Sequence, residues 1–370
     1  MAQKLAMHVQ QLMDKESRMF DFRTPDTPPV LLVLDRRTDL VTPLLLPWTY
    51  QAMLHDLFTL RNGKLQDSSL QDSSLGGEDV LLQDPFFKDN KYSNYGQIGE
   101  NVQKMVRDLE RKTRESSHLD SIPDMKRFVE EYPEYRKLSA NASKHFKLAE
   151  QINKRVEGER LLDLSEVQQT LATGPTNYNS HYALLNTHLR RSDLKREAKM
   201  ILALIFALRY SQNAQFNFLQ LHEALGDGSG LIDFLLKFTL KDTPIASGKL
   251  AAPPAAEQLS QRTVNMLAFS QESVYTQHVP PVVAIVDNLM KGKLSSSQYP
   301  ATSNSSLGAL SEKPQDIIVF IVNGSTFGEE FALQKLAQAV PAVSILLGSN
   351  CIHNTASLLS EAQRLHAYFS

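Results

Sequence analysis

The stretch IIVFIVNGSTFGEEFALQKLAQAVPAVSILL, residues 317–347, decides the fold of this chain. It contains two short aliphatic and β-branched runs without alternation, 317–322 and 343–347, which are typical of strands buried on both faces of a parallel sheet. Residues 329–339 between these runs and residues 355–365 after them have helical spacing. Strand, helix, strand, helix in this order predicts a parallel βαβ arrangement.

A third run of the same kind, VLLVL at residues 30–34, lies far upstream, before a long and mostly helical segment. We therefore predict one α/β sheet that is interrupted by a large helical insertion. Residues 282–289, which follow Pro280 and Pro281, have a spacing that favours a helix opened by proline, although their valines also suit a strand.

The insertion begins with two polar helical segments. Residues 89–117 carry one narrow apolar stripe, formed by Ile98, Val102, Met105, Val106 and Leu109. Residues 122–172 form a second block, with interruptions expected at Pro133 and Gly158 and with few apolar positions. A pair of helices as polar as these is expected to form an exposed hairpin. Loops are expected at 64–79, where QDSSL occurs twice in succession, at 241–258 and at 291–314.

Composition and charge exclude several classes of protein. The 370 residues carry 39 basic and 41 acidic side chains, a net charge of −2, and 42% are hydrophobic, which is ample for a folded core. The balanced charge argues against a nucleic-acid-binding protein. One cysteine, Cys351, fits a reducing compartment. The longest apolar stretch, 200–208, is far shorter than the ~20 residues that cross a bilayer and predicts a buried helix; a membrane role would require a partner.

Asp35 lies at the carboxyl end of the first strand, where α/β enzymes place catalytic groups. An aspartyl phosphotransferase would need a second acid two residues later, but Arg37 occupies that position. We interpret Asp35 as a strand-end residue that caps the turn or pairs with Arg36 or Arg37. The rival hypothesis is a hydrolase or phosphatase-like enzyme with a helical cap that uses Asp35.

Other catalytic and metal-binding patterns are incomplete. His222 and Glu223 begin a helical zinc motif whose second histidine is replaced by Gly226. Cys351 and His353 are two residues apart, but the sequence offers them no obvious acid or oxyanion donor. We therefore expect no catalytic residue, no cofactor and no bound metal.

Five collinear blocks that span almost the whole chain resemble the SM (Sec-one/Munc-eighteen-like) family of SNARE-assembly proteins, in particular its endosomal branch. The blocks are VLLVLDRRTDLVTPLLLPWTYQAMLHDL (30–57), DPFFKDNKYSNYGQIGENV (84–102), DMKRFVEEYPEYRKLSANASKH (124–145), SVYTQHVPP (273–281) and KPQDIIVFIVNGSTFGEE (313–330). The resemblance implies an arch-shaped α/β plus all-α architecture. Its parts would be the first half of an α/β domain at 1–62, a helical third domain at 63–270 and the returning half of the α/β domain at 271–370.

The resemblance also implies a function. Family members are not enzymes; they bind a syntaxin-like Qa-SNARE in the arch, and a helical hairpin at the tip of the third domain assembles SNARE helices, including the R-SNARE. We expect a cytoplasmic monomer without nucleic-acid partners, which associates through SNAREs with endosomal and trans-Golgi membranes and serves vesicle docking and protein transport.

Carried over by position, the tip hairpin is approximately residues 122–156, and the SNARE-binding residues expected on it are Pro133, Tyr135, Leu138, His145 and Phe146. Pro133 occupies the position of the family's loop proline, where it could permit a bent or an extended hairpin. A second set is expected to be structural: Asp35, Arg36, Asp39, Thr42, Pro43 and Trp48.

Full family members begin with another α/β domain, which holds the syntaxin N-terminal peptide, whereas this sequence starts inside the second domain. It also lacks the opening strands of that second domain. We accordingly expect an N-terminally truncated form, which is a fragment, a partial gene model or a short isoform, with no binding of that peptide. The sheet edge that the missing strands would cover is expected to lie open, which is a liability for solubility.

Overall fold

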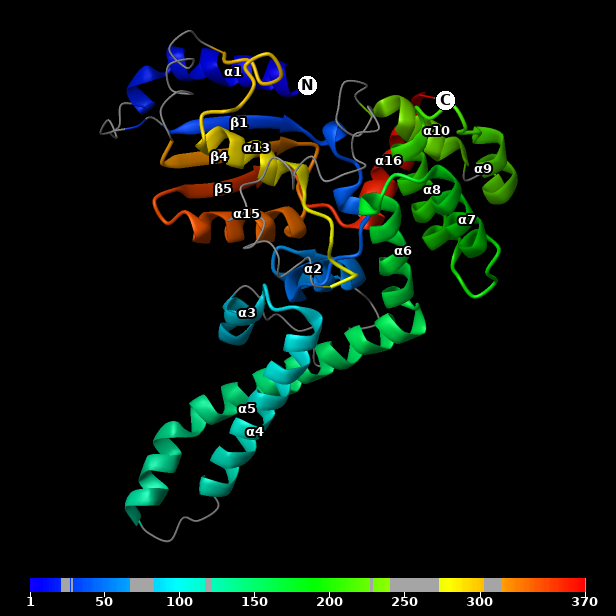
Figure 1. The fold of residues 1–370 in the computed structure, drawn as a ribbon. Coiled ribbons are helices and arrows are strands. Elements are labelled where there is room, and N and C mark those ends of the chain that lie inside the picture. The colour runs from blue at the N-terminus through cyan, green and yellow to red at the C-terminus, as the bar shows by residue number, and fades with distance from the viewer. Residues whose placement is uncertain are drawn as a thin grey trace. The chain divides into compact units, whose positions relative to one another are not determined.

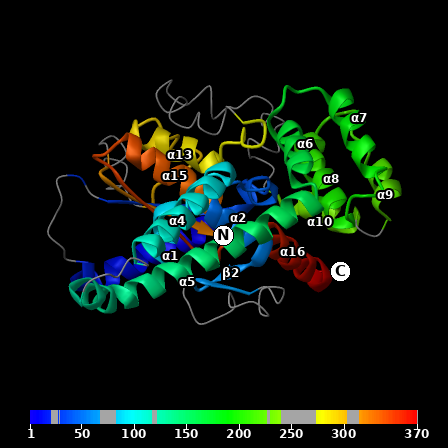
Figure 2. The same ribbon diagram turned by 90° about the horizontal axis from the view of Figure 1, so that it is seen from below.

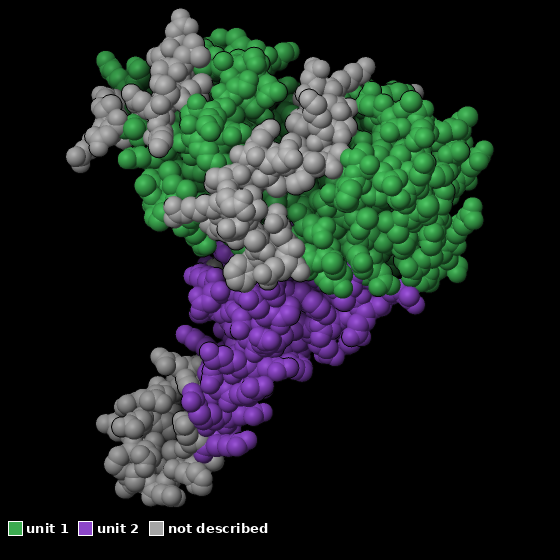
Figure 3. All heavy atoms as spheres, viewed as in Figure 1, with its two compact units in different colours: residues 1–46, 163–370 green, residues 47–162 purple. Residues whose placement is uncertain are grey.

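The computed structural model describes residues 1–20, 27, 29–66, 83–116, 122–226, 229–239, 273–302 and 314–369. The chain divides into two compact units, residues 1–46 with 163–370 and residues 47–162 (Figure 3). These cuts differ from the expected domain boundary at 62/63, and the expected boundary at 270/271 lies outside the described residues. The three-part domain division therefore stays a prediction.

The first unit contains a three-stranded parallel sheet in the order β1-β4-β5, built from β1 (Val30–Asp35), β4 (Asp316–Val322) and β5 (Ser344–Ser349) (Figure 1). Helices α13 (Pro281–Met290) and α15 (Phe327–Ala339) pack on one face of it. The strands expected at 30–34, 317–322 and 343–347 are confirmed, and residues 282–289 form a helix, which settles the alternative left open there.

The core of this unit lies between that sheet face and the two helices. Leu32 and Val319 are neighbours in register and are buried, as are Val283 and Val286 of α13 and Leu333 of α15. The other face differs: Leu31, Ile318 and Leu346 form one row across the three strands and are 42%, 39% and 61% exposed. One face of the sheet thus holds the core, and the other presents apolar side chains to solvent, so the expectation that these strands are buried on both faces was wrong.

Helices make up the remainder of the first unit: α1 (Ala2–Lys15), η1 (Ser17–Phe20), most of α6 (Leu161–Thr173), α7 (Tyr178–Leu189), α8 (Arg196–Tyr210), α9 (Phe218–Leu225), α10 (Ser229–Phe238) and α16 (Thr355–Phe369). Residues 202–210 of α8 are all buried, which confirms the buried helix expected at 200–208. None of the helices among the described residues combines the length and apolar character that a bilayer span requires.

The second unit is built around a long helical pair. It contains α2 (Tyr50–Phe58), a short hairpin of β2 (Leu60–Arg61) and β3 (Lys64–Leu65), α3 (Pro85–Asn90), α4 (Tyr95–Ser116) and α5 (Ile122–Gly158). Asn62 and Gly63 connect β2 to β3 with φ angles of 52° and 75°, a conformation that asparagine and glycine tolerate best. Helices α4 and α5 lie side by side in both views (Figures 1 and 2).

Two expectations about this pair were wrong. The backbone of α5 is helical from residue 122 to residue 158 without an interruption at Pro133, although α5 does end at Gly158 as expected. The second wrong expectation was that residues 122–156 form the hairpin by themselves. They belong to a single helix, α5, and α4 is the other helix of the hairpin. Proline in a helix interior costs about 3 kcal/mol, which the remaining turns of a 37-residue helix can offset.

Parts of the expected loops lie outside the described residues, namely 67–79 of the QDSSL segment, all of 241–258, and 303–313. The short helices η2 (Arg36–Thr38) and η3 (Thr42–Leu44) follow β1 directly and belong to the first unit.

Candidate functional site

The inner faces of the helical hairpin carry its apolar residues. The buried positions of α4 and of α5 recur every three or four residues, which is the spacing of one helix face. These positions are Ile98, Val102 and Met105 on α4, and Ala142, His145, Leu148, Ile152 and Val156 on α5. These buried residues pack inside the unit, and the opposite faces of α4 and α5 are available for other contacts.

Phe146 lies on the outer face of α5 with 54% of its surface exposed. Its neighbours on that side, Ser143 and Glu150, are exposed and polar. Scattered apolar residues are common on protein surfaces. Among the described residues of 47–162, however, Phe146 is the one large hydrophobic side chain with this degree of exposure. Full burial of an exposed phenylalanine is worth about 1.5–3 kcal/mol, and about half of the surface of Phe146 is still open to such a contact.

His145, the preceding residue, is completely buried. Its Nδ1 lies 2.8 Å from the hydroxyl of Tyr50, and its Nε2 lies 3.1 Å from Oδ2 of Asp84. Its ring also packs on Phe86, with a centroid separation of 4.5 Å. A side chain without exposed surface cannot touch a bound helix, so the expected SNARE contact of His145 is wrong, and its role is to hold the helix in place.

Asp84 connects this cluster to α3. Its carboxylate accepts a hydrogen bond from the backbone N–H of Phe87 at the start of α3 and lies 2.5 Å from Nζ of Lys144. Burial raises the pKa of Asp84, but the bonds to His145 and Lys144 outweigh burial and hold the pKa well below its usual range. The same burial, together with the charge of Asp84, raises the pKa of Tyr50. Because Asp84 stays ionised, it ties α3 and α5 together.

The other expected hairpin residues are less informative. Leu138 is half-buried on α5. Positions 133 and 135 lie within the helical backbone of α5, and their side chains are outside the described residues.

Three of the expected structural residues, Arg36, Asp39 and Thr42, form a buried network in the first unit. The guanidinium of Arg36 donates to both carboxylate oxygens of Glu329, at 2.9 and 2.8 Å, and to the carbonyl and carboxylate oxygens of Asp39, at 2.8 and 3.1 Å. Arg36 is 4% exposed and Glu329 is 1% exposed. Burial lowers the pKa of Arg36, but the two carboxylates outweigh burial and raise it. Arg36 thus bonds the end of β1 to the start of α15.

The network extends through Asp39 and Thr42. Asp39 accepts hydrogen bonds from the backbone N–H groups of Val41 and Thr42, and the hydroxyl of Thr42 lies 2.5 Å from Asp39 and 2.8 Å from Nε2 of His278. Burial lowers the pKa of His278, so its imidazole is neutral near pH 7. The carbonyl of Pro43 accepts a hydrogen bond of 3.1 Å from the hydroxyl of Thr355.

Trp48 belongs to the second unit. It is buried, contacts the ring of Tyr95 edge-on at 5.7 Å, and its carbonyl accepts from the Tyr95 N–H. These contacts hold Trp48 against the start of α4.

Asp35 has the structural surroundings that the sequence predicted. It is 5% exposed, accepts hydrogen bonds from Nε and Nη2 of Arg37 at 2.9 and 2.7 Å, and lies 3.4 Å from the terminal amine of Met1. Burial raises its pKa, but the bonds from Arg37 outweigh burial, so its pKa is lowered. A carboxylate that is buried, ionised and paired in this way is poorly placed for acid–base or nucleophilic catalysis, which weakens the enzyme hypothesis.

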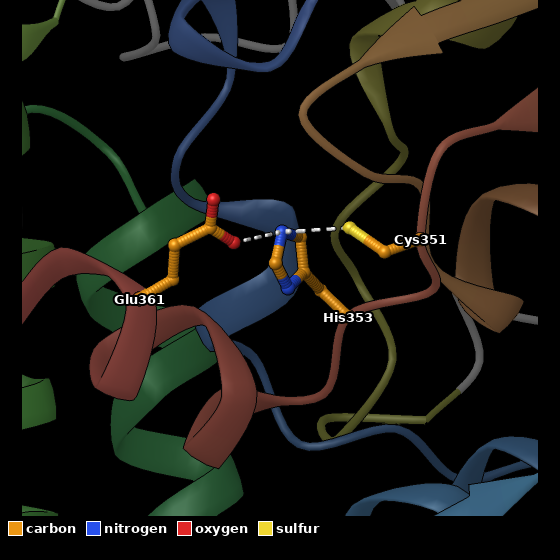
Figure 4. Close-up of side chains that lie close together, drawn as sticks. All are labelled: Cys351, His353 and Glu361. Carbon is orange, nitrogen blue, oxygen red and sulfur yellow. Dashed lines mark hydrogen bonds and ion pairs between the residues drawn. The ribbon is translucent and has the colours of Figure 1, made fainter. Parts of the chain in front are cut away.

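Sequence reasoning missed one residue near Cys351. Glu361 of α16 lies beside Cys351 and His353, with its Oε2 3.5 Å from Nε2 of His353, and the sulfur of Cys351 lies 3.6 Å from the same nitrogen (Figure 4). Burial and the charge of Glu361 raise the pKa of the Cys351 thiol, which disfavours the thiolate of a thiol enzyme. His353 and Glu361 are eight residues apart in the sequence, and this spacing by itself gave no reason to expect their side chains to lie together.

Comparisons with known proteins converge on one family. The Sec1 family model matches residues 1–361. Vacuolar protein sorting-associated protein 45 from Rattus norvegicus is 34% identical over 378 aligned residues, which are 99% of this chain and 65% of the rat protein. Its counterpart in Schizosaccharomyces pombe is 34% identical over 97% of this chain and 65% of that protein. This chain thus spans just under two thirds of the length of these relatives.

A solved structure described as the SM protein Vps45 in complex with the Qa SNARE Tlg2 superposes with a TM-score of 0.84 at 35% identity, covering 99% of this chain and 65% of that one. The Unc18–syntaxin 1 complex of Monosiga brevicollis, at 17% identity and a TM-score of 0.71, shares the fold. These matches confirm the predicted fold class, a parallel-sheet α/β part combined with a large helical part, and the resemblance to the SM family.

Proposed function

Because this chain belongs to the Sec1 family, we propose that it binds a syntaxin-like Qa-SNARE and promotes SNARE assembly during vesicle docking and fusion. The observation that carries the proposal is Phe146, an exposed aromatic residue on the outer face of a long helix whose inner face is closed. The solved complex of Vps45 with the Qa SNARE Tlg2 supports the class of partner.

The outer face of α5 is the surface on which a partner helix docks. An amphipathic helix buries anchors spaced by whole turns in such a surface. Position 135 lies 11 residues before Phe146, which is about three helical turns along the same side of α5. Leu138, which is half-buried, flanks this line. The partner's apolar stripe would cover Phe146, and the polar residues Ser143 and Glu150 would border the contact.

The buried cluster of Tyr50, Asp84 and His145 serves as a rigid support for this surface. It fixes the helix immediately next to Phe146, so the aromatic ring is presented from a preorganised backbone. A preorganised template reduces the ordering entropy that two disordered SNARE helices lose when they fold together. An R-SNARE is the second helix that this template would align.

The protein acts by binding rather than by catalysis. The paired Asp35 carboxylate and the fully bonded Arg36 network serve the fold in this proposal. The name of the relatives, vacuolar protein sorting-associated protein 45, supports a role in intracellular protein sorting. We place this role in endosomal and trans-Golgi transport, where the protein would be held at membranes through its SNARE partners. The expected division into domains at 1–62, 63–270 and 271–370 is part of the same proposal.

Phe146→Asp tests the surface. The variant should bind the cytosolic part of a Tlg2-type Qa-SNARE, alone and with an R-SNARE, at least 10-fold more weakly, because a hot-spot aromatic contributes on the order of 2 kcal/mol. Calorimetric titration measures the affinity, and a thermal melt should show an unchanged fold, since the side chain is exposed. The control Gln103→Asp introduces the same charge on an exposed position of α4 and should bind normally.

Two results would contradict the proposal in different ways. Unchanged SNARE binding by Phe146→Asp would eliminate the hairpin surface while leaving SNARE binding itself in place. Failure of the unmodified chain to bind any Qa-SNARE would eliminate the proposed function for this chain.

A further inference from the structure

We propose that Cys351, His353 and Glu361 form a binding site for a divalent transition-metal ion, with Zn²⁺ as the best match. The three side chains converge from the turn after β5 and from α16 (Figure 4). Thiolate, imidazole and carboxylate are the ligand types of protein zinc sites. The inference departs from the sequence-based expectation that the chain binds no metal.

Two of the three distances between the ligand atoms match tetrahedral coordination. Zn–S bonds of about 2.3 Å and Zn–N bonds of about 2.0–2.1 Å at a tetrahedral angle place sulfur and nitrogen about 3.6 Å apart. The sulfur of Cys351 lies 3.6 Å from Nε2 of His353, that nitrogen lies 3.5 Å from Oε2 of Glu361, and all three ligand atoms are within 4.8 Å of one another. For a zinc ion to bind, Nε2 has to turn from the carbonyl oxygen of Asn323, which lies 2.9 Å away, toward the sulfur and the carboxylate.

The surroundings of His353 provide the outer contacts that a metal-bound histidine needs. Its Nδ1 lies 3.1 Å from the hydroxyl oxygen of Ser357, and that hydroxyl can donate in turn to the carbonyl of Asn354 at 3.0 Å. Without metal, Nε2 is 2.9 Å from the carbonyl oxygen of Asn323 and donates to it. On metal binding the imidazole proton would move to Nδ1 and be donated to Ser357, which orients the ring as in other zinc sites.

The proton balance of binding is simple. The imidazole stays neutral and only changes tautomer, Glu361 binds through its carboxylate, and the Cys351 thiol releases one proton to solvent as the metal–sulfur bond forms. Glu361 is 37% exposed, so the ion and a water in the fourth position have access from solvent.

Gly324 provides the space for this cluster. A Cβ added at Gly324 would lie 2.3 and 2.6 Å from ring atoms of His353 and 2.9 Å from the sulfur of Cys351, and φ at this position is +97°. The thiol and the imidazole therefore occupy volume that a side chain at position 324 would fill. The turn after β4 is shaped around the two ligands.

The competing interpretation is a simple His353–Glu361 ion pair. The 3.5 Å separation exceeds that of a good hydrogen bond, and the Nε2 proton is engaged by Asn323. Nε2 therefore makes no strong hydrogen bond to the Glu361 carboxylate. This arrangement favours a site in which both groups bind one metal ion over a direct ion pair.

The presence of a single cysteine makes the test specific, because a thiol reagent reports on Cys351 alone. Metal-free protein is titrated with Co²⁺ to follow the sulfur-to-cobalt charge-transfer absorption, and Zn²⁺ is then added in competition. We expect a saturable band with one ion per chain, its loss on Zn²⁺ addition, a thiol modification rate at least 10-fold lower with saturating Zn²⁺, and a raised Tm.

Two conservative variants remove ligands without enlarging the site. Cys351→Ser should abolish the charge-transfer band, and Glu361→Gln should weaken Co²⁺ and Zn²⁺ binding at least 10-fold, while circular dichroism shows an intact fold. Glu223→Gln, at an exposed glutamate of α9, and His8→Gln, at an exposed histidine of α1, are the matched controls and should bind normally. Absence of the band in the unmodified chain, Zn²⁺-independent thiol modification, or unchanged binding by Glu361→Gln would each overturn the site.

Discussion

Arg36 shows how one buried side chain can organise the end of a sheet. A guanidinium removed from water is costly unless its donors are matched, and here two carboxylates and a carbonyl accept from it. Its partners Asp39 and Glu329 come from segments almost three hundred residues apart in sequence. Glu329 also forms a capping box with Thr326 at the start of α15. The network therefore holds the end of β1 to the turn between β4 and α15.

His181 is a buried residue whose protonation state should control stability. It is 4% exposed, and its Nδ1 lies 2.8 Å from the hydroxyl of Tyr210. Burial, with a smaller contribution from the charge of Arg209, lowers the pKa of His181 from 6.5 to about 4. Between these two pH values the unfolded chain binds more protons than the folded chain, so stability falls as pH drops from about 6.5 to about 4.

The variant His181→Gln, which cannot be protonated, should lack this contribution. The difference in unfolding free energy between the original protein and the variant should shift by on the order of 3 kcal/mol across that pH window, in favour of the variant at low pH. Urea unfolding at a series of pH values measures the effect. His8→Gln, at an exposed position, should retain the original pH profile. Parallel pH profiles for His181→Gln and the original protein would exclude this role.

At the scale of the elements, α5 is the feature for which local propensity predicted least well. The pattern of few apolar residues and a central proline suggested a helical block that breaks at Pro133. The helix instead runs through that position and places one apolar face against α4. Packing along α4 and the cooperativity of a long helix outweigh one missing backbone hydrogen bond.

Pro133→Ala should therefore stabilise the helix. It restores the backbone N–H donor to the carbonyl four residues earlier and removes a cost of about 3 kcal/mol. Hydrogen exchange of the amides on either side of position 133 should slow by at least 10-fold. Ala140→Gly, at an exposed position of the same helix, should have the opposite sign, with a cost of about 1 kcal/mol. Faster exchange in Pro133→Ala would mean that the proline holds a geometry on which the helix depends.

At the scale of the molecule, the sheet is unusual in leaving a row of apolar residues exposed. Leu31, Ile318 and Leu346 are adjacent across three strands on the face opposite to the core. This exposed face is a different feature from the open sheet edge expected from the sequence, which stays a prediction. Such a patch favours association between molecules.

Leu346→Lys should reduce this association. Because Leu346 is 61% exposed, the free energy of unfolding should change by no more than about 0.5 kcal/mol, while the second virial coefficient measured by static light scattering becomes more positive. Gln338→Lys adds the same charge on an exposed position of α15 and isolates the effect of charge. An equal change in both variants would show that the apolar row plays no part.

The sequence by itself determined the strands, the parallel βαβ order, the buried helix α8 and the family. The strands and the buried helix depend on local runs, because short aliphatic and β-branched stretches are typical of parallel strands and a buried helix is apolar on most sides. The family depends on longer collinear blocks of residues. The turn role of Asp35 was predictable from the local sequence, since its main partner, Arg37, is two residues away.

Only the tertiary structure decided which side chains are available. His145 and Phe146 are adjacent and both were expected at the binding surface, but about 100° of helical rotation separates them, and α5 packs so that one is buried and the other exposed. Glu361 joins Cys351 and His353 only because the chain turns after β5 and α16 folds back beside it. Contacts of this kind depend on how elements pack against one another, and no local pattern in the sequence records that packing.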